Sequence, residues 1–228
     1  MASVRFDIIS IGTLVRNRLW NENEVVRTAH ATTTLVRSGK RLILVDPGLP
    51  AAAIGARLSE RTGLKPAQID TIFLTSFKPH CLSGIEAFPK AKILIHEVEQ
   101  DYARSQLTRL MQQAPEEDID RAYMQKELEM LERCEIAPDE LTADVDLFPL
   151  PGYTPGLCGL LIKSPLTTAL IAGAGVPTLD HFLAGQVLPE SKDIPQAQES
   201  LKEAYEIADL IVPGFDNVFL NPRAQGLG

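Results

Sequence analysis

The sequence lacks an uninterrupted apolar run long enough to cross a bilayer, so a transmembrane helix is excluded as its organising element. Residues 1–12 also lack a basic segment followed by a long apolar stretch, so neither a secretion signal nor a transit peptide is predicted. No cluster of Lys or Arg stands out, and 22 basic against 30 acidic residues give a net charge of −8. We therefore expect a cytoplasmic protein whose partners are neither nucleic acids nor membranes.

Cysteine is scarce. Cys81, Cys134 and Cys158 are an odd number of residues at unrelated spacings, which favours reduced thiols over a disulfide framework. Cys134 is expected in a helix and Cys158 in a strand, and burial without reactivity is the simplest expectation for both.

Linkers, repeats and charge blocks are absent from the sequence as well. The 228 residues are enough to bury a substantial core, and 45% hydrophobic with 23% charged residues is ordinary for a globular protein. We therefore predict a single domain over residues 1–228.

Strands and helices alternate along most of the chain. Helical spacing or a proline start predicts helices at 51–62, 97–112, 116–134 and 195–208, the third beginning near Pro115 with the acidic residues that follow it. The two middle helices form a helical excursion at about 97–134. Short apolar runs rich in β-branched residues predict strands at 6–10, 32–36, 41–45, 71–75, 91–95, 145–150, 159–162, 168–172 and 209–212. This order predicts a layered, mixed α/β domain.

Five short turn motifs follow predicted strands. They are VDPG at 45–48, TSFKPHCLSG at 75–84, LPGYTPG at 150–156, IAGAG at 171–175 and IVPGF at 211–215. Their order and spacing resemble the motif series of the metallo-β-lactamase superfamily over about residues 30–220. That resemblance implies a four-layer αββα sandwich, and it implies metal-dependent hydrolysis as the ancestral activity.

The residues at the family's metal-ligand positions differ from the family pattern. Members of the family use histidines and aspartates of these turns to hold one or two metal ions, which generate a hydroxide. Asp46 matches the first motif, but all seven ligand positions are substituted, by Ser76, Lys78, His80, Cys81, Tyr153, Ala174 and Phe215. Lys78 brings positive charge and Phe215 an apolar ring, so we expect no metal and no other cofactor. Asp46 is expected to bind backbone N–H groups in its own tight turn.

Three hypotheses about function remain open. The first is a non-hydrolytic pseudoenzyme that binds a small molecule or a protein partner in a pocket formed by the substituted turns, with Lys78 as an anchor for an anion. The second is a divergent hydrolase, using one atypical metal on His80, Cys81 and Asp216 or a metal-free mechanism based on His80 and Cys81. The third is a structural subunit in which the segment 97–134 forms an oligomer interface. The sequence indicates neither the ligand nor the oligomeric state.

Overall fold

The computed structural model describes residues 4–115 and 119–225, and its strands form two six-stranded sheets. The first sheet has the order β1 (Arg5–Ser10), β2 (Thr33–Ser38), β3 (Arg41–Val45), β4 (Thr71–Leu74), β5 (Lys92–Ile95) and β6 (Cys134–Ile136). The second sheet has the order β12 (Phe219–Leu220), β11 (Leu210–Pro213), β10 (Thr168–Gly173), β9 (Cys158–Lys163), β8 (Val145–Pro149) and β7 (Glu140–Thr142).

The helices lie outside the two sheets. They are α1 (Ala51–Thr62), α2 (Pro79–Leu82), α3 (Glu97–Gln113), α4 (Ile119–Glu132), α5 (Leu179–Ala184) and α6 (Ile194–Ile207). Four short 3-10 turns complete the described elements: η1 (Arg18–Trp20), η2 (Pro66–Gln68), η3 (Ile85–Ala87) and η4 (Pro222–Gln225). None of the helices described is both long and apolar enough to cross a membrane.

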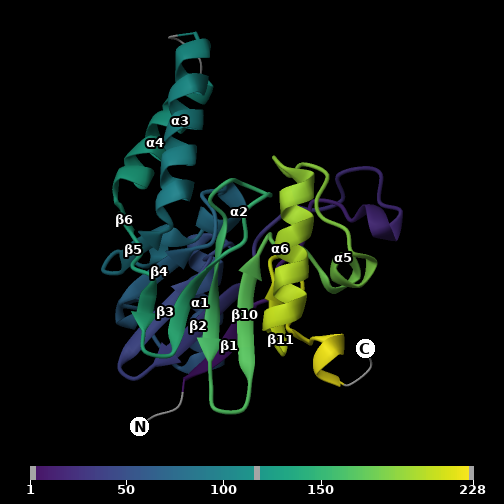
Figure 1. Ribbon diagram of the computed structural model, residues 1–228. Helices are drawn as coiled ribbons and strands as arrows, with labels where there is room; N and C mark the ends of the chain where they lie inside the picture. The colour runs from purple at the N-terminus through teal and green to yellow at the C-terminus, as the bar shows by residue number, and fades with distance from the viewer. Residues whose placement is uncertain (1–3, 116–118, 226–228) are drawn as a thin grey trace.

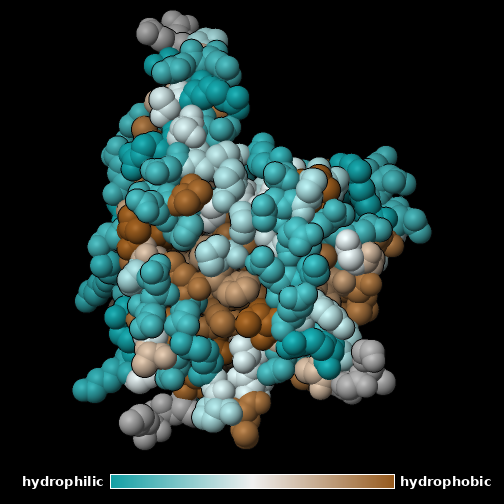
Figure 2. Space-filling model, in the orientation of Figure 1, coloured by the Kyte–Doolittle hydropathy of each residue, from teal (hydrophilic) through white to brown (hydrophobic). Residues whose placement is uncertain are grey.

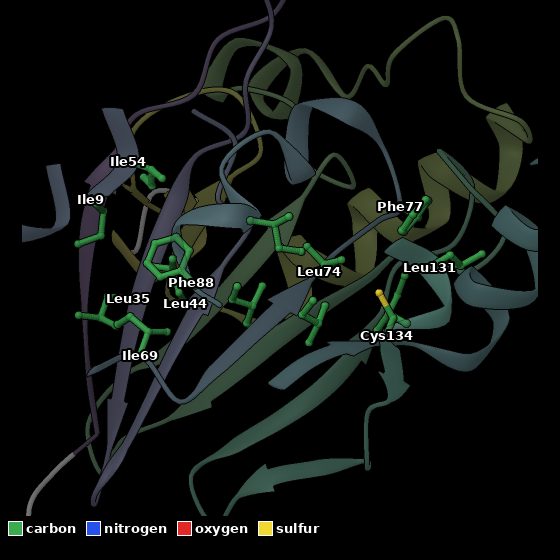
Figure 3. Packing of buried hydrophobic residues seen from close by; sticks show 14 of the residues in the cluster. Ile9, Leu35, Leu44, Ile54, Ile69, Leu74, Phe77, Phe88, Leu131 and Cys134 are labelled. Carbon is green, nitrogen blue, oxygen red and sulfur yellow. The ribbon is translucent and has the colours of Figure 1, made fainter. Parts of the chain in front are cut away.

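Three apolar cores separate four layers, which confirms the αββα sandwich. Side chains of a strand alternate between its two faces, and β4 shows the result: Ile72 and Leu74 pack toward the helices, while Phe73 packs between the sheets. The outer core of the first sheet includes side chains of α1, α3 and α4 (Figure 3). The outer core of the second sheet includes Phe182 of α5 and Leu201 of α6, and α6 lies along β10 and β11 in Figure 1.

The helices α3 and α4 form a hairpin that rises above the sandwich in Figure 1. On the face shown in Figure 2, the upper part of this hairpin is mainly hydrophilic, and apolar side chains gather below it. Met124, Leu128 and Leu131 of α4, which keep helical spacing, pack against the outer core of the first sheet. That apolar stripe is therefore core, and it is not free to form the oligomer interface of the third hypothesis.

Most of the predicted helices and strands are present, and the differences between prediction and structure concern short elements. The helix 51–62 is confirmed by α1, and the helices predicted at 97–112, 116–134 and 195–208 correspond to α3, α4 and α6. Cys134 was expected in a helix, but it opens β6, because the chain leaves α4 at Glu132 and pairs in parallel with β5. The predicted start of that helix at residues 116–118 lies outside the described residues.

Candidate functional site

Strand direction brings the five turn motifs to one edge of the sandwich. The strands β3 and β4 are parallel, so the turn with Asp46 and the turn from Thr75 to Cys81 leave the first sheet at the same edge. The strands β10 and β11 are also parallel; Ala174 is the first residue after β10, and Phe215 is the second after β11. A backbone hydrogen bond of 3.0 Å from the N–H of Cys158, at the start of β9, to the carbonyl of Thr75 joins the two sheets there.

Asp46 ties the first turn to the second. Its carboxylate accepts a hydrogen bond of 2.9 Å from the N–H of Thr75 and one of 2.6 Å from Thr75 Oγ1. From the sequence, the side chain of Asp46 was expected to bind N–H groups of its own turn. In the structure it binds the N–H of Thr75, at the end of the neighbouring strand β4. Asp46 has a positive φ of 48° and is 2% exposed. Burial raises its pKa to about 7, although the hydrogen bonds from Thr75 act in the opposite direction.

Cys81 is a buried thiol in the short helix α2. Its Sγ lies 3.6 Å from Ser76 Oγ and 4.0 Å from Thr75 Oγ1, and the side chain is 2% exposed. Burial, and next the negative charge of Asp46, raise its pKa well above the ordinary value. A thiol in these surroundings stays protonated at neutral pH, and the protonated form is a poor nucleophile and a poor metal ligand.

His80 is held among aromatic rings. Its ring centroid lies 5.0 Å from that of Phe215 in an edge-on arrangement and 6.2 Å from that of Tyr153. Burial, with a smaller effect from Lys78, lowers the pKa of His80 to about 4, so the imidazole is neutral at physiological pH. Ala174 of the fourth motif and Phe215 of the fifth are both 6% exposed, so their side chains are buried at this edge of the sandwich.

Lys78 is directed to the helical hairpin. Its Nζ lies 6.0 Å from the ring centroid of Tyr102 in α3, and the side chain lines a cavity of about 140 Å³ together with Tyr102, Gln106 and Glu127. Burial raises the pKa of Glu127, and the charge of Lys78 offsets part of that increase. The positive charge of Lys78 therefore favours the ionised form of Glu127 and of Glu99 at this edge.

Glu99 is a site residue that the sequence did not reveal. It is 1% exposed in α3, and its Oε1 accepts a hydrogen bond of 2.8 Å from the N–H of Phe77 in the second motif. Burial raises its pKa, while Thr154, Phe77 and Lys78 act to lower it. Glu99, Ala103 and Leu107 are the buried residues of α3, spaced by four. A glutamate on an apolar stripe is the signal that could have identified it.

The donor groups at this edge do not fit the family's metal ions. A zinc site normally needs three or four protein ligands, and no group of three or more His, Cys, Asp or Glu side chains that could hold a metal occurs within the described part of the chain. Asp216 does not complete the pair of His80 and Cys81. Its carboxylate accepts hydrogen bonds from the N–H groups of Leu179, at 3.2 Å, and Asn217, at 2.8 Å.

Solved structures with the same fold were found across the whole chain. A metallo-beta-lactamase candidate from Thermotoga maritima has a TM-score of 0.69 and 17% identity, covering 96% of this chain and 100% of that one. The hydrolase AbOPH has a TM-score of 0.66 and 19% identity, covering 96% and 87%. A variant of AiiA from B. thuringiensis, with N-decanoyl-L-homoserine bound at its active site, has a TM-score of 0.66 and 20% identity, covering 93% and 92%.

Comparison with sequence families agrees with the structure. A search of curated proteins gave no match. The family profile described as "Metallo-beta-lactamase superfamily" matches residues 27–214, which is more than four fifths of the chain. The chain belongs to the metallo-beta-lactamase superfamily.

Proposed function

We propose that this chain is a cytoplasmic, non-hydrolytic member of its superfamily that works by binding a small molecule or a protein partner. Its three cysteines are free and buried, which suits a reducing compartment. The term non-hydrolytic here means that the chain does not carry out the family reaction, in which bound metal ions generate a hydroxide that hydrolyses the substrate.

The packing of His80 against Phe215 carries this proposal. The ring of Phe215, which is 6% exposed, occupies the position of the final family ligand and contacts the one histidine of the second motif. An apolar ring donates no electron pair to a metal, and this one packs against the imidazole of His80. The chemistry of these side chains therefore supports a packed edge in place of a metal centre.

A metal-free hydrolase based on His80 and Cys81 is the competing hypothesis. Such a mechanism needs a thiolate within hydrogen-bond reach of a base. The thiol of Cys81 has a raised pKa and lies beside the hydroxyls of Ser76 and Thr75. These surroundings favour an inert thiol, and the experiment below distinguishes the two hypotheses.

Elemental analysis of the purified chain tests the proposal. We expect zinc, iron and manganese well below one ion per chain. Stoichiometric metal that is lost in Cys81→Ala and kept in Cys134→Ala would overturn the proposal, since Cys134 is also a buried thiol and lies at the start of β6, outside the five turn motifs.

Hydrolysis assays give a second, independent test. Because a similar solved structure is an N-acyl homoserine lactone hydrolase with N-hexanoyl-L-homoserine at its catalytic metal centre, N-hexanoyl-homoserine lactone is the first substrate to try, with a thioester and a phosphodiester beside it. We expect no turnover above the uncatalysed rate. Turnover abolished by His80→Ala would establish the competing hypothesis.

A further inference from the structure

A cavity of about 340 Å³ lies apart from the five turn motifs. Its walls come from the loop that precedes β2 and from the chain around and after α5. The lining residues are Leu14, Val15, Arg16, Arg18, Val25, His181, Leu188, Pro189 and Glu190. None of them belongs to a turn motif, and the volume lies within the range of small-molecule sites.

A hydrogen bond between distant segments joins the two walls, and further contacts lie within the N-terminal loop. Trp20 Nε1 donates a hydrogen bond of 2.6 Å to Asp180 Oδ2 of α5, across 160 residues of sequence. The guanidinium of Arg27 lies 5.8 Å from the centroid of the Trp20 ring, and Arg16 Nη1 donates a 2.9 Å hydrogen bond to the carbonyl of Asn23 within the loop. Figure 1 accordingly shows the purple N-terminal segment beside α5. The cavity is thus bounded by a loop that is hydrogen-bonded to α5.

The lining combines an apolar surface with positive charge. Leu14, Val15, Val25, Leu188 and Pro189 are apolar, while Arg16 and Arg18 are cationic and Glu190 is the one carboxylate among the lining residues. The side chain of Arg18 makes no hydrogen bond or ion pair to any residue of the described ranges, and the residue is exposed.

His181 contributes an oriented imidazole to the same cavity. Its Nδ1 lies 2.8 Å from Thr178 Oγ1, which fixes the ring, and the residue is 5% exposed. Burial lowers its pKa, so the ring is neutral and serves as a hydrogen-bonding group rather than a charge. The charged lining residues, Arg16, Arg18 and Glu190, therefore sum to one positive charge, while the nearby carboxylate of Asp180, which is not a lining residue, accepts the hydrogen bond from Trp20 Nε1.

We propose that this cavity binds a small organic monocarboxylate with a short apolar chain. The two arginines supply the planar, bidentate donors that suit a carboxylate, and the apolar residues contact the chain. One net positive charge matches one carboxylate, and Glu190 disfavours a dianion such as phosphate. This inference rests on the proposed function. It names the class of small molecule that the chain binds, and it places the binding site away from the five turn motifs.

Trp20 provides the assay, because it is the only tryptophan in the sequence, shares the turn η1 with the cavity residue Arg18 and is hydrogen-bonded to Asp180 beside the cavity residue His181. Straight-chain acids from acetate to octanoate are titrated against the full chain, with tryptophan fluorescence and calorimetry as readouts. We expect saturable binding whose Kd falls about fourfold per added methylene until the cavity is full. Hexanol and hexylamine, which keep the chain and change the head group, should bind at least tenfold more weakly than hexanoate.

Matched arginine variants test the head-group contact. Arg18→Gln should weaken hexanoate binding about tenfold, and it is exposed enough for the fold to tolerate the change. Arg61→Gln, at the exposed end of α1, removes the same charge elsewhere and should leave the Kd unchanged.

Three results would overturn the inference: no saturable binding of any acid up to about 10 mM, hexanol binding as tightly as hexanoate, or an equal loss in Arg18→Gln and Arg61→Gln. Stoichiometric metal in the elemental analysis would overturn the proposed function and leave the carboxylate site standing. Metal-free protein that binds no acid would overturn this inference alone.

Discussion

The buried carboxyl group of Asp46 should make the stability of the fold depend on pH in an unusual direction. Its pKa rises from an ordinary value of 3.8 to about 7 on folding, because burial disfavours the charged form. The folded state therefore holds the proton more tightly than the unfolded state. The stability contributed by this group is present below about pH 4 and is lost as the pH rises through about 7.

The magnitude follows from the two pKa values. Between pH 5 and pH 8 the folded protein should lose roughly 2 to 3 kcal/mol of unfolding free energy through Asp46 alone. Asp46→Asn removes the titration and keeps an acceptor for the N–H of Thr75. The variant should therefore gain roughly 2 to 3 kcal/mol of unfolding free energy relative to the parent protein over that interval.

Urea unfolding followed by circular dichroism at pH 5, 6, 7 and 8 measures this difference. Other titrating groups, including His80 and Glu99, are common to both proteins and cancel in the comparison. Asp101→Asn, which removes an exposed carboxyl group from α3, is the control and should run parallel to the parent. Parallel curves for Asp46→Asn and the parent would refute the reasoning, since Asp46 would then titrate as an ordinary aspartate.

Two further predictions concern the same edge of the sandwich. Gly173 has a φ of 51°, and an added Cβ would approach Thr75 Cβ to 2.8 Å, so Gly173→Ala should cost about 3 kcal/mol. Gly39→Ala, with a φ of 59° and open space around it, should cost only about 1 kcal/mol in the same unfolding assay, and equal costs would contradict the steric argument. Ellman's reagent should detect no rapidly reacting thiol in the native protein and three in urea, because Cys81, Cys134 and Cys158 are all buried. Rapid reaction of Cys81 in the native state would instead support the nucleophile hypothesis.

The long strands and helices could be predicted from the sequence, because the apolar pattern that favours each of them lies within the element itself. The runs RLILV and TIFL are apolar on both faces, as strands between two cores must be. The strands β6, β7 and β12 were missed, since they have only two or three residues and form through pairing with distant neighbours. The helix α5 was also missed, although Thr178 is an N-cap whose side chain accepts from the N–H of His181.

The site could be located from the sequence but not described. The order of the motifs predicted that Ser76, His80, Cys81 and Phe215 lie at one edge of the sandwich. The parallel pairs β3/β4 and β10/β11 bring the turns that carry them to that edge. Whether His80 contacts a metal, a thiol or an aromatic ring depends on side-chain packing, which spacing does not determine. The contacts of Glu99 with the second motif and of Trp20 with α5 join segments far apart in the chain.

Each sheet is drawn from one uninterrupted half of the chain: β1 to β6 precede β7 to β12. During synthesis the first sheet can therefore pair completely before the second has left the ribosome. Until then, the nascent half exposes the face that later lies between the sheets, including Val36, Ile43 and Phe73. Such a face is prone to aggregation, so we expect a fragment ending near residue 137 to need a chaperone, or the separately supplied second half, to remain in solution.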